Sequence, residues 1–159
     1  MSGPKAYSEG AVLLDTDVYS YLMKGGKQAA IYRPHIDGKL IALSFITVGE
    51  LHFGAYRRGW GTDRIEAMKD RLRSVVLVPF DIGVCETYAR IKAKLEKKGE
   101  PLADNDLWIA ACAIRHSIPL VSNNLKHFQR IPDLVLKSEA MAIRFDEASS
   151  PGTRRGSKG

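Results

Sequence analysis

The sequence predicts an α/β fold with a central, mostly parallel sheet of four or five strands and helices on both faces. Two observations lead to this prediction. Short, continuous apolar runs recur along the chain, as expected for strands that are buried on both faces. Segments with helical apolar spacing separate these runs, so helices join consecutive strands and the strands run parallel. The expected strands are 11–14, 40–43, 75–78, 119–122 and 134–136, the last at a sheet edge.

The expected helices are bounded by capping residues and glycines. The first begins at Asp17 or Ser20 and ends before the Gly-Gly pair at 25–26, because glycine often terminates helices. Ser44 is expected to cap a helix that continues to Arg58, and Asp104 to cap a helix over 105–116. Further helices are expected at 28–35, 62–72 and 82–98.

The chain is expected to contain one folded domain, residues 11–147, between a flexible N-terminal segment, 1–10, and a disordered basic tail, 148–159. No apolar run approaches the ~20 residues of a membrane-spanning helix. The first ten residues lack the apolar core of a signal peptide. We therefore expect no membrane association and a cytoplasmic location.

Composition excludes several classes of site. Cys85 and Cys112 lie far apart in the sequence and are expected to be reduced, and the four histidines do not provide the closely spaced ligands of a zinc site. The formal net charge is +6, but three cationic residues lie in 149–159, which contains no acid, so the rest of the chain carries +3. This mildly basic charge is compatible with a polyanionic partner.

Three acids stand out by their context. Asp15 ends the first strand, Glu50 lies among apolar residues of a helix, and Asp106 lies in the first turn of another. The ends of parallel strands are where α/β folds build their sites, and carboxylate oxygens suit a hard cation such as Mg²⁺. Burying Glu50 would be costly unless a cation or a donor satisfied it.

Each acid also has an interpretation without function. Asp15 or Asp17 could cap the helix that follows, and Asp17 is the better placed of the two. Glu50 could face solvent and pair with Arg57. With Asp104 as the cap of its helix, Asp106 is left to act as a ligand.

Four segments, in this order, resemble the PIN-domain ribonucleases of the VapC toxin type. They are Leu-Leu-Asp-Thr-Asp-Val at 13–18, Thr-Val-Gly-Glu-Leu at 47–51, Asn-Asp-Leu-Trp-Ile-Ala-Ala at 105–111 and Leu-Val-Ser-Asn-Asn-Leu-Lys-His-Phe at 120–128. The resemblance covers residues 11–136. It implies a PIN-like three-layer fold and an endoribonuclease that depends on Mg²⁺ or Mn²⁺. It also implies the toxin of a toxin–antitoxin module, a homodimer, and a cognate antitoxin.

The resemblance also implies roles for individual residues. Asp15, Glu50 and Asp106 match the acids that bind the metal, and they are the expected catalytic residues. Asp17, Ser122 and Asn124 are expected to orient these ligands and a water molecule. Two positions depart from the fuller pattern. Asp17 stands where many members have Asn, and Asn124 stands where four-acid members have Asp, which leaves a second metal position open.

Basic and aromatic residues near the turn between two helices are candidates for contacts with RNA. A guanidinium group binds phosphate, and an indole can stack on an unpaired base. The alternative is a solvated helix end. The candidates are Arg57, Arg58, Trp60 and Arg64.

Two other functions fit parts of the same pattern. Asp-Thr-Asp at 15–17 resembles the opening motif of haloacid dehalogenase-like phosphatases, in which the first Asp is a nucleophile and the second a general acid. That motif favours Thr or Val at the position of Tyr19 and leaves Glu50 without a role. A non-catalytic, PIN-like partner-binding module is the other possibility, although an empty cluster of carboxylates would repel itself.

Overall fold

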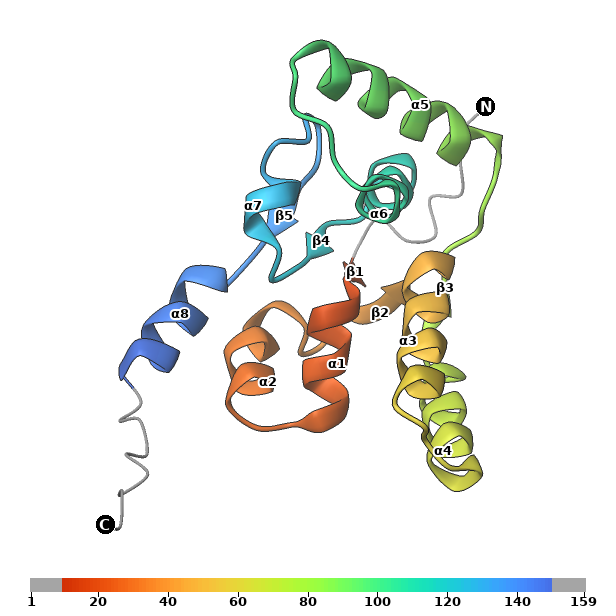
Figure 1. The fold of residues 1–159 in the computed structure, drawn as a ribbon, viewed down its shortest axis with the longest axis vertical. Helices are drawn as coiled ribbons and strands as arrows, with labels where there is room; N and C mark the ends of the chain where they lie inside the picture. The colour runs from red at the N-terminus through yellow and green to blue at the C-terminus, as the bar shows by residue number, and fades with distance from the viewer. Residues whose placement is uncertain (1–9, 150–159) are drawn as a thin grey trace, which may run out of the picture.

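Five short parallel strands form the centre of the computed structural model, which describes residues 10–149 (Figure 1). The order across the sheet is β3-β2-β1-β4-β5, so β5 lies at an edge as expected. Ala11 of β1 pairs with Leu40 of β2, and Leu14 pairs with Val121 of β4. The strands are β1 (Ala11–Leu14), β2 (Leu40–Leu43), β3 (Val76–Leu77), β4 (Leu120–Val121) and β5 (Leu136–Lys137).

Helices connect the strands and extend beyond the last one. Where one helix was expected over 28–35, the chain forms α2 and then a short 3-10 turn that contains Pro34, which lacks the N–H that a continuing helix needs. The helices are α1 (Thr16–Lys24), α2 (Lys27–Tyr32), η2 (Arg33–His35), α3 (Phe45–Arg57), α4 (Thr62–Leu72), α5 (Ile82–Lys97), α6 (Asp104–Arg115), α7 (Leu125–Phe128) and α8 (Ala140–Ser149).

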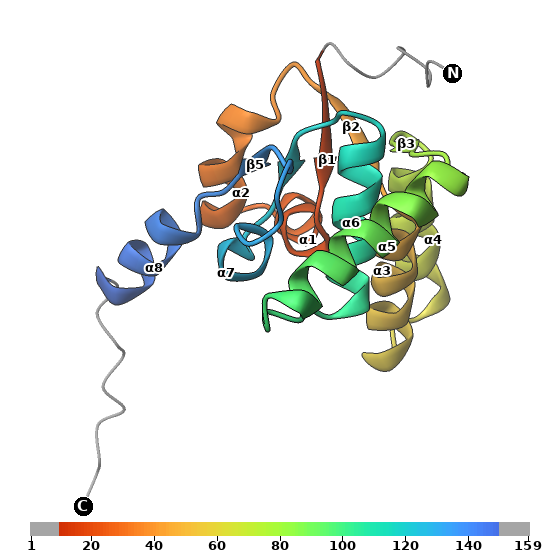
Figure 2. The same cartoon turned by 90° about the horizontal axis from the view of Figure 1, so that it is seen from above.

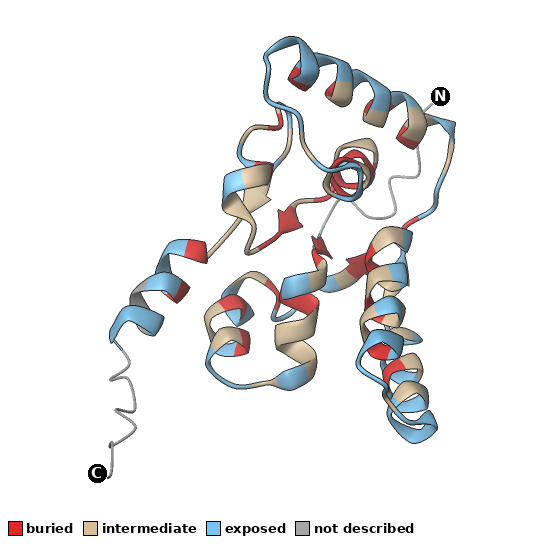
Figure 3. Cartoon of the chain, viewed as in Figure 1, coloured by how far each residue is buried: buried red, intermediate tan, exposed pale blue. Residues whose placement is uncertain are grey.

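The sheet is buried on both faces, and β1 shows this most clearly. Its four residues are each at most 6% exposed. Ala11 and Leu13 belong to a core shared with α5 and α6, whereas Val12 and Leu14 belong to a second core shared with α1, α2, α3 and α4. The views in Figures 2 and 3 show helices on opposite sides of the strands, with buried residues on their inner faces. The expected three-layer α/β/α fold is confirmed.

Two expected helix caps differ in the structure. Asp15 caps α1, because its carboxylate accepts a hydrogen bond of 2.7 Å from the backbone N–H of Thr16. The expectation that Asp17 is the better cap is wrong. Asp104 is the first residue of α6 and does not cap it; its carboxylate instead accepts hydrogen bonds from Tyr88 and Lys92 of α5. The predicted cap Ser44 is confirmed, with its hydroxyl 3.2 Å from the backbone nitrogen of Thr47.

Helix α8 follows β5 and was not expected from the sequence. Ala140 and Ile143 are buried, and Ile143 joins the core on the side of α1 and α2. The helix includes residues 148 and 149, which the sequence analysis assigned to the tail. Residues 150–159 of that tail and residues 1–9 lie outside the described residues.

Two further expectations concern the cysteines and the membrane. Both cysteines are free, with Cys112 buried and Cys85 half-buried. Within residues 10–149, no helix is long and apolar enough to span a membrane.

The buried hydroxyl of Tyr32 joins three parts of the fold. It donates a hydrogen bond of 2.9 Å to the side-chain oxygen of Asn123, which follows β4, and accepts one of 3.1 Å from the backbone N–H of Glu139, which precedes α8. The ring itself is fully buried. The hydroxyl therefore links α2 to the chain on either side of β5.

We expect Tyr32→Phe to lower the free energy of unfolding by about 1–3 kcal/mol, because the buried hydroxyl is lost and the half-buried N–H of Glu139 loses its acceptor. Urea denaturation measures this change. Tyr56→Phe is the control, since Tyr56 is 63% exposed, and it should change stability by less than about 0.5 kcal/mol. Equal effects of the two substitutions would show that the Tyr32 hydroxyl does not stabilise the fold.

Candidate active site

Asp15 lies where β1 ends, between the two strands that flank it. The connection after β1 leads to β2 on one side of the sheet, whereas β4 pairs with β1 on the other, so Asp15 occupies the switch point of the strand order. Its backbone N–H donates to the carbonyl of Val121, and its carbonyl accepts from the N–H of Tyr19. The backbone on both sides of the residue is therefore fixed, and the side chain is only 6% exposed.

The environment of Asp15 disfavours its ionised form. Burial raises the pKa of Asp15 to about 6, although hydrogen bonds from the Ser122 hydroxyl and the Thr16 N–H favour the charged carboxylate. The negative charges of Asp17 and Asp106 raise the pKa further. Asp15 therefore lies in a region of negative potential that a cation would relieve.

Ser122 and Asn124 follow β4 and reach Asp15 from the neighbouring strand. The buried hydroxyl of Ser122 donates a hydrogen bond of 2.7 Å to the second carboxylate oxygen of Asp15 and accepts one of 2.9 Å from the backbone N–H of Asn124. Ser122 thus contacts Asp15 as the sequence analysis expected. The side chain of Asn124 instead lies next to His127.

Glu50 reaches the same region from α3. One of its oxygens accepts a short hydrogen bond from the Thr16 hydroxyl, and the other accepts from the Asn105 amide at 2.9 Å. The alternative of an ion pair with Arg57 is wrong. Although Glu50 lies among apolar residues of α3, this part of the helix is not buried, since the nearby Phe53 is 64% exposed.

Asp106 lies in the first turn of α6 and is held by His127. Oδ2 of Asp106 is 2.8 Å from Nδ1 of His127, and the same nitrogen is 2.8 Å from the amide nitrogen of Asn124. One ring nitrogen cannot donate to the carboxylate and accept from the amide at once, so the tautomer of His127 decides which contact is the hydrogen bond. His127 therefore lies against both Asn124 and Asp106, and it is hydrogen-bonded through Nδ1 to one of them.

Asp17 completes the acidic group from the first turn of α1. Burial raises the pKa of Asp17, and the charges of Glu50 and Asp106 raise it further, while Lys24 lowers it. The four acids thus interact through their charges. In the part of the chain that the structure describes, no three His, Cys, Asp or Glu side chains are arranged closely enough to bind one metal ion together.

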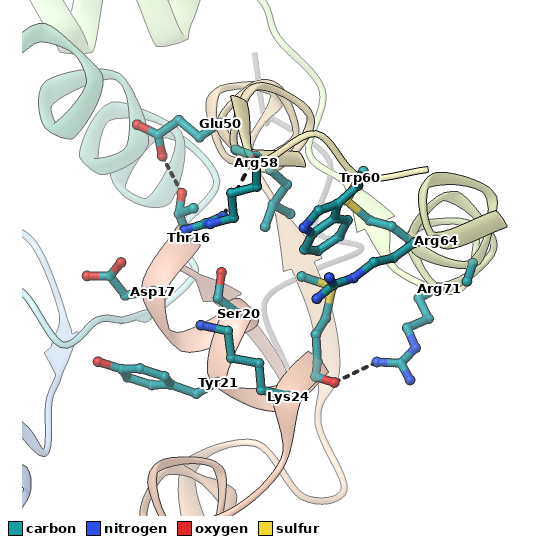
Figure 4. A pocket seen from close by; sticks show the side chains of 15 residues that line it. Thr16, Asp17, Ser20, Tyr21, Lys24, Glu50, Arg58, Trp60, Arg64 and Arg71 are labelled. Atoms are coloured by element: carbon teal, nitrogen blue, oxygen red, sulfur yellow. Dashed lines mark hydrogen bonds between the residues drawn. The ribbon is translucent and has the colours of Figure 1, made fainter. Parts of the chain in front are cut away.

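A pocket of about 610 Å³ opens beside this acidic group, between α1, α3 and α4 (Figure 4). Asp17 and Glu50 line one part of it. Three of the four predicted RNA contacts also line it: Arg58, Trp60 and Arg64. The fourth, Arg57, does not.

Among the residues that sequence reasoning missed are three that bind the acids and two cations that line the pocket. Thr16, Asn105 and His127 bind the acidic side chains, and the only signal for them was their position beside the acids within the quoted segments. Lys24 and Arg71 line the pocket from α1 and α4. No local pattern relates these two residues, because they line the same pocket only as a result of the packing of α1 against α4.

Comparison with known proteins identifies the family of this chain. The model of the PIN domain family matches residues 12–134. The ribonuclease VapC1 of Haemophilus influenzae is 35% identical over 127 residues, which cover 77% of this chain and 92% of that protein. The matched region contains all the acids of the candidate site.

Solved structures show the same fold. VapBC2 from Rickettsia felis, bound to a DNA fragment, matches with a TM-score of 0.71 and 27% identity over 80% of this chain and 98% of that one. VapBC-1 from nontypeable Haemophilus influenzae matches with a TM-score of 0.70 and 32% identity over 80% and 97%. The family model covers most of the chain, and the curated relatives are matched over nearly their whole length. The chain therefore belongs to the PIN-domain family, among the relatives of the VapC ribonucleases.

Proposed function

We propose that this protein is a metal-dependent endoribonuclease and the toxin of a toxin–antitoxin pair. The observation that carries the proposal is the buried carboxyl group of Asp15, which lies at the switch point of a PIN-domain sheet among other carboxylates. Curated relatives at 31–35% identity are named ribonucleases. The same site supports an RNA-cleaving hydrolase here.

The side chains around Asp15 fit a hard divalent cation. All candidate ligand atoms are carboxylate oxygens, which Mg²⁺ and Mn²⁺ prefer, and the raised pKa values of Asp15 and Asp17 reflect burial and like charges that a cation would offset. Asp15 and Asp106 would hold Mg²⁺ or Mn²⁺, with Glu50 acting directly or through water. When bound, such a cation lowers the pKa of a water molecule and offsets the charge that develops on the scissile phosphate.

The neighbouring residues position these ligands. Ser122 and the N–H of Thr16 hold the two oxygens of Asp15, so that carboxylate has a fixed orientation. His127 holds Asp106 from the segment after β4. Glu50 is held only by the Thr16 hydroxyl and the exposed Asn105, so its carboxylate can turn toward a cation by exchanging two side-chain hydrogen bonds.

The roles of Asp17 and Asn124 follow from where they lie. Asp17 lines the pocket, where its charge adds to the field of the other acids. Asn124 contacts His127 and, through its backbone, Ser122. We assign both residues to the orientation of ligands and water.

The alternatives have less support. The chain belongs to the PIN family, and the PIN-type interpretation gives both Asp15 and Glu50 a role. The haloacid dehalogenase-like interpretation leaves Glu50 without one. A non-catalytic module would need Asp15 only as the cap of α1, and a neutral residue such as Asn would cap this helix without the cost of burying a charge. The solved relatives are VapBC complexes, so we propose an antitoxin protein as the partner, together with a homodimeric, cytoplasmic toxin.

Cleavage is tested with purified, antitoxin-free protein, total cellular RNA and Mg²⁺ or Mn²⁺, followed by mapping of the cut ends. We expect discrete cuts with 5′-phosphates that disappear when the metal is chelated. Asp106→Asn should slow cleavage at least about 100-fold, because a carboxylate that holds the cation is lost.

Asp104→Asn is the matched control for this experiment. Asp104 lies two residues earlier on the same helix, but its exposed carboxylate is paired with Lys92 and Tyr88. This variant should cleave within about threefold of the natural protein. Cleavage that survives chelation, or that survives Asp106→Asn unchanged, would contradict the assignment.

The raised pKa of Asp15 also predicts how stability depends on pH without metal. The unfolded chain ionises this carboxyl near pH 3.8, whereas the folded chain holds its proton to about pH 6. Between these values the folded state binds more protons than the unfolded state, so this group's contribution to stability is present below about pH 4 and is lost as the pH rises through about 6.

Asp15→Asn should therefore be more stable than the natural protein above about pH 6, by roughly 2 kcal/mol, and equally stable near pH 3.5. The amide stays neutral, and Asn is a favourable helix cap. Urea denaturation with chelator across this pH range measures the difference. Added Mn²⁺ should raise the melting temperature of the natural protein more than that of the variant. A variant that is less stable at pH 7.5 without metal would contradict the cost of burying Asp15.

A further inference from the structure

The pocket beside the acidic group has opposite charges at its two ends. Thr16, Asp17 and Glu50 line the end that meets the candidate cation site. The rest of the lining includes four cationic side chains from α1, α4 and the end of α3. They are Lys24, Arg58, Arg64 and Arg71. A ligand in this pocket would therefore lie next to the acids and be surrounded by positive charge.

Three of these cations are available to an anion. Arg71 donates a hydrogen bond of 2.8 Å to the carbonyl of Met23, which holds it at the edge of α1. Arg58 donates only a long hydrogen bond of 3.5 Å to the carbonyl of Gly54, which is exposed and easily exchanged. Lys24, Arg58 and Arg64 are exposed, and none of them forms an ion pair with another residue of the described range 10–149. Figure 4 shows the charged ends of these three side chains reaching into the space between the helices.

Trp60 and Arg64 form a flat surface in the same pocket. The guanidinium carbon of Arg64 lies 3.7 Å from the centre of the Trp60 ring, while the indole also packs against the core beneath. The indole keeps the guanidinium group in place, and Arg64 is exposed, so its guanidinium plane is accessible to a ligand in the pocket. Unpaired bases of RNA stack on such arginine planes.

We propose that this pocket binds one unpaired ribonucleotide directly adjacent to the scissile phosphate. Lys24 and Arg58 bind its phosphate, and Arg64, supported by Trp60, stacks on its base. This inference rests on the proposed ribonuclease function. The volume of about 610 Å³ lies in the range of pockets that enclose a small organic ligand, and a single nucleotide is such a ligand.

The observations favour RNA over a protein segment as the occupant. The basic side chains of the pocket lie next to the candidate metal site. They can bind one phosphate while the next phosphate of the same RNA strand lies at the acids. The flat surface formed by Trp60 and Arg64 lies beside them and can stack on a base. A single strand of RNA can make both contacts when its consecutive nucleotides lie at the two ends of the pocket.

Binding is tested without cleavage, using full-length Asp106→Asn protein and a fluorescein-labelled, single-stranded RNA of twelve mixed-sequence nucleotides. Fluorescence anisotropy gives the dissociation constant over a range of salt concentrations. Adding Lys24→Gln or Arg58→Gln should weaken binding about three- to tenfold and reduce the slope of log K against log salt by about 0.7, since each removes one phosphate contact. Adding Arg64→Gln should weaken binding about tenfold through lost stacking.

Arg57→Gln is the matched control. Arg57 is exposed and adjacent to Arg58 but does not line the pocket, so this proposal excludes it from the RNA contacts predicted from the sequence. The substitution removes the same charge from the same helix end and should change affinity less than twofold. Circular dichroism confirms that each variant is folded. Equal effects of Arg57→Gln and Arg58→Gln would overturn the proposal, since they would show a diffuse charge effect.

Cleavage of total RNA by the corresponding variants with Asp106 intact separates this proposal from the function on which it rests. The subsite is supported if Arg58→Gln raises KM and leaves kcat within about threefold. Unaltered RNA binding and cleavage in all three pocket variants would overturn the subsite and leave the nuclease intact. If the variants weakened binding only to a co-purified antitoxin, the pocket would be a protein-binding site instead. If the natural protein neither bound nor cleaved RNA, the proposed ribonuclease function itself would be contradicted.

Discussion

The fixed position of Asp15 is the constraint on which the candidate site depends. β1 is buried on both faces and paired on both edges, so its backbone cannot shift without breaking the sheet. The hydrogen bonds from Asp15 to Val121 and from Tyr19 to Asp15 then fix the residue at which the strand becomes a helix. The carboxylate is consequently held at the switch point of the sheet by the same contacts that form the core.

The other acids are held more loosely, and this difference has a physical reason. Asp15 receives hydrogen bonds from a backbone N–H and a buried hydroxyl, which together offset only part of its cost of burial. Glu50 and Asp106 are only half-buried and are held by side chains alone. A site with one rigid carboxylate and two adjustable ones can fit a cation without rearranging the sheet.

Local sequence patterns located the strands and the acids, but they could not identify partners from distant segments. Asp15 was predictable because a buried apolar run ends on it. The cap predicted for Asp104 is wrong because Tyr88 and Lys92, from the preceding helix, bind its carboxylate. His127, twenty-one residues after Asp106, became its partner only through packing of α7 on α6. Helix α8 was missed because, among those of its residues whose burial the structure describes, the buried apolar ones are Ala140 and Ile143.

The separation of charge within the pocket links the two proposed ligands. The carboxylates of Asp17 and Glu50 repel a phosphate until a cation offsets them, whereas Lys24 and Arg58 attract a phosphate with or without it. On the proposed assignment, the cation strengthens RNA binding at the acidic end, and RNA must strengthen cation binding there by the same factor. A strand held at the basic end alone is bound but has no cation at its scissile phosphate. Cleavage therefore requires a cation at the acidic end, whereas the basic end increases how much RNA is bound beside it.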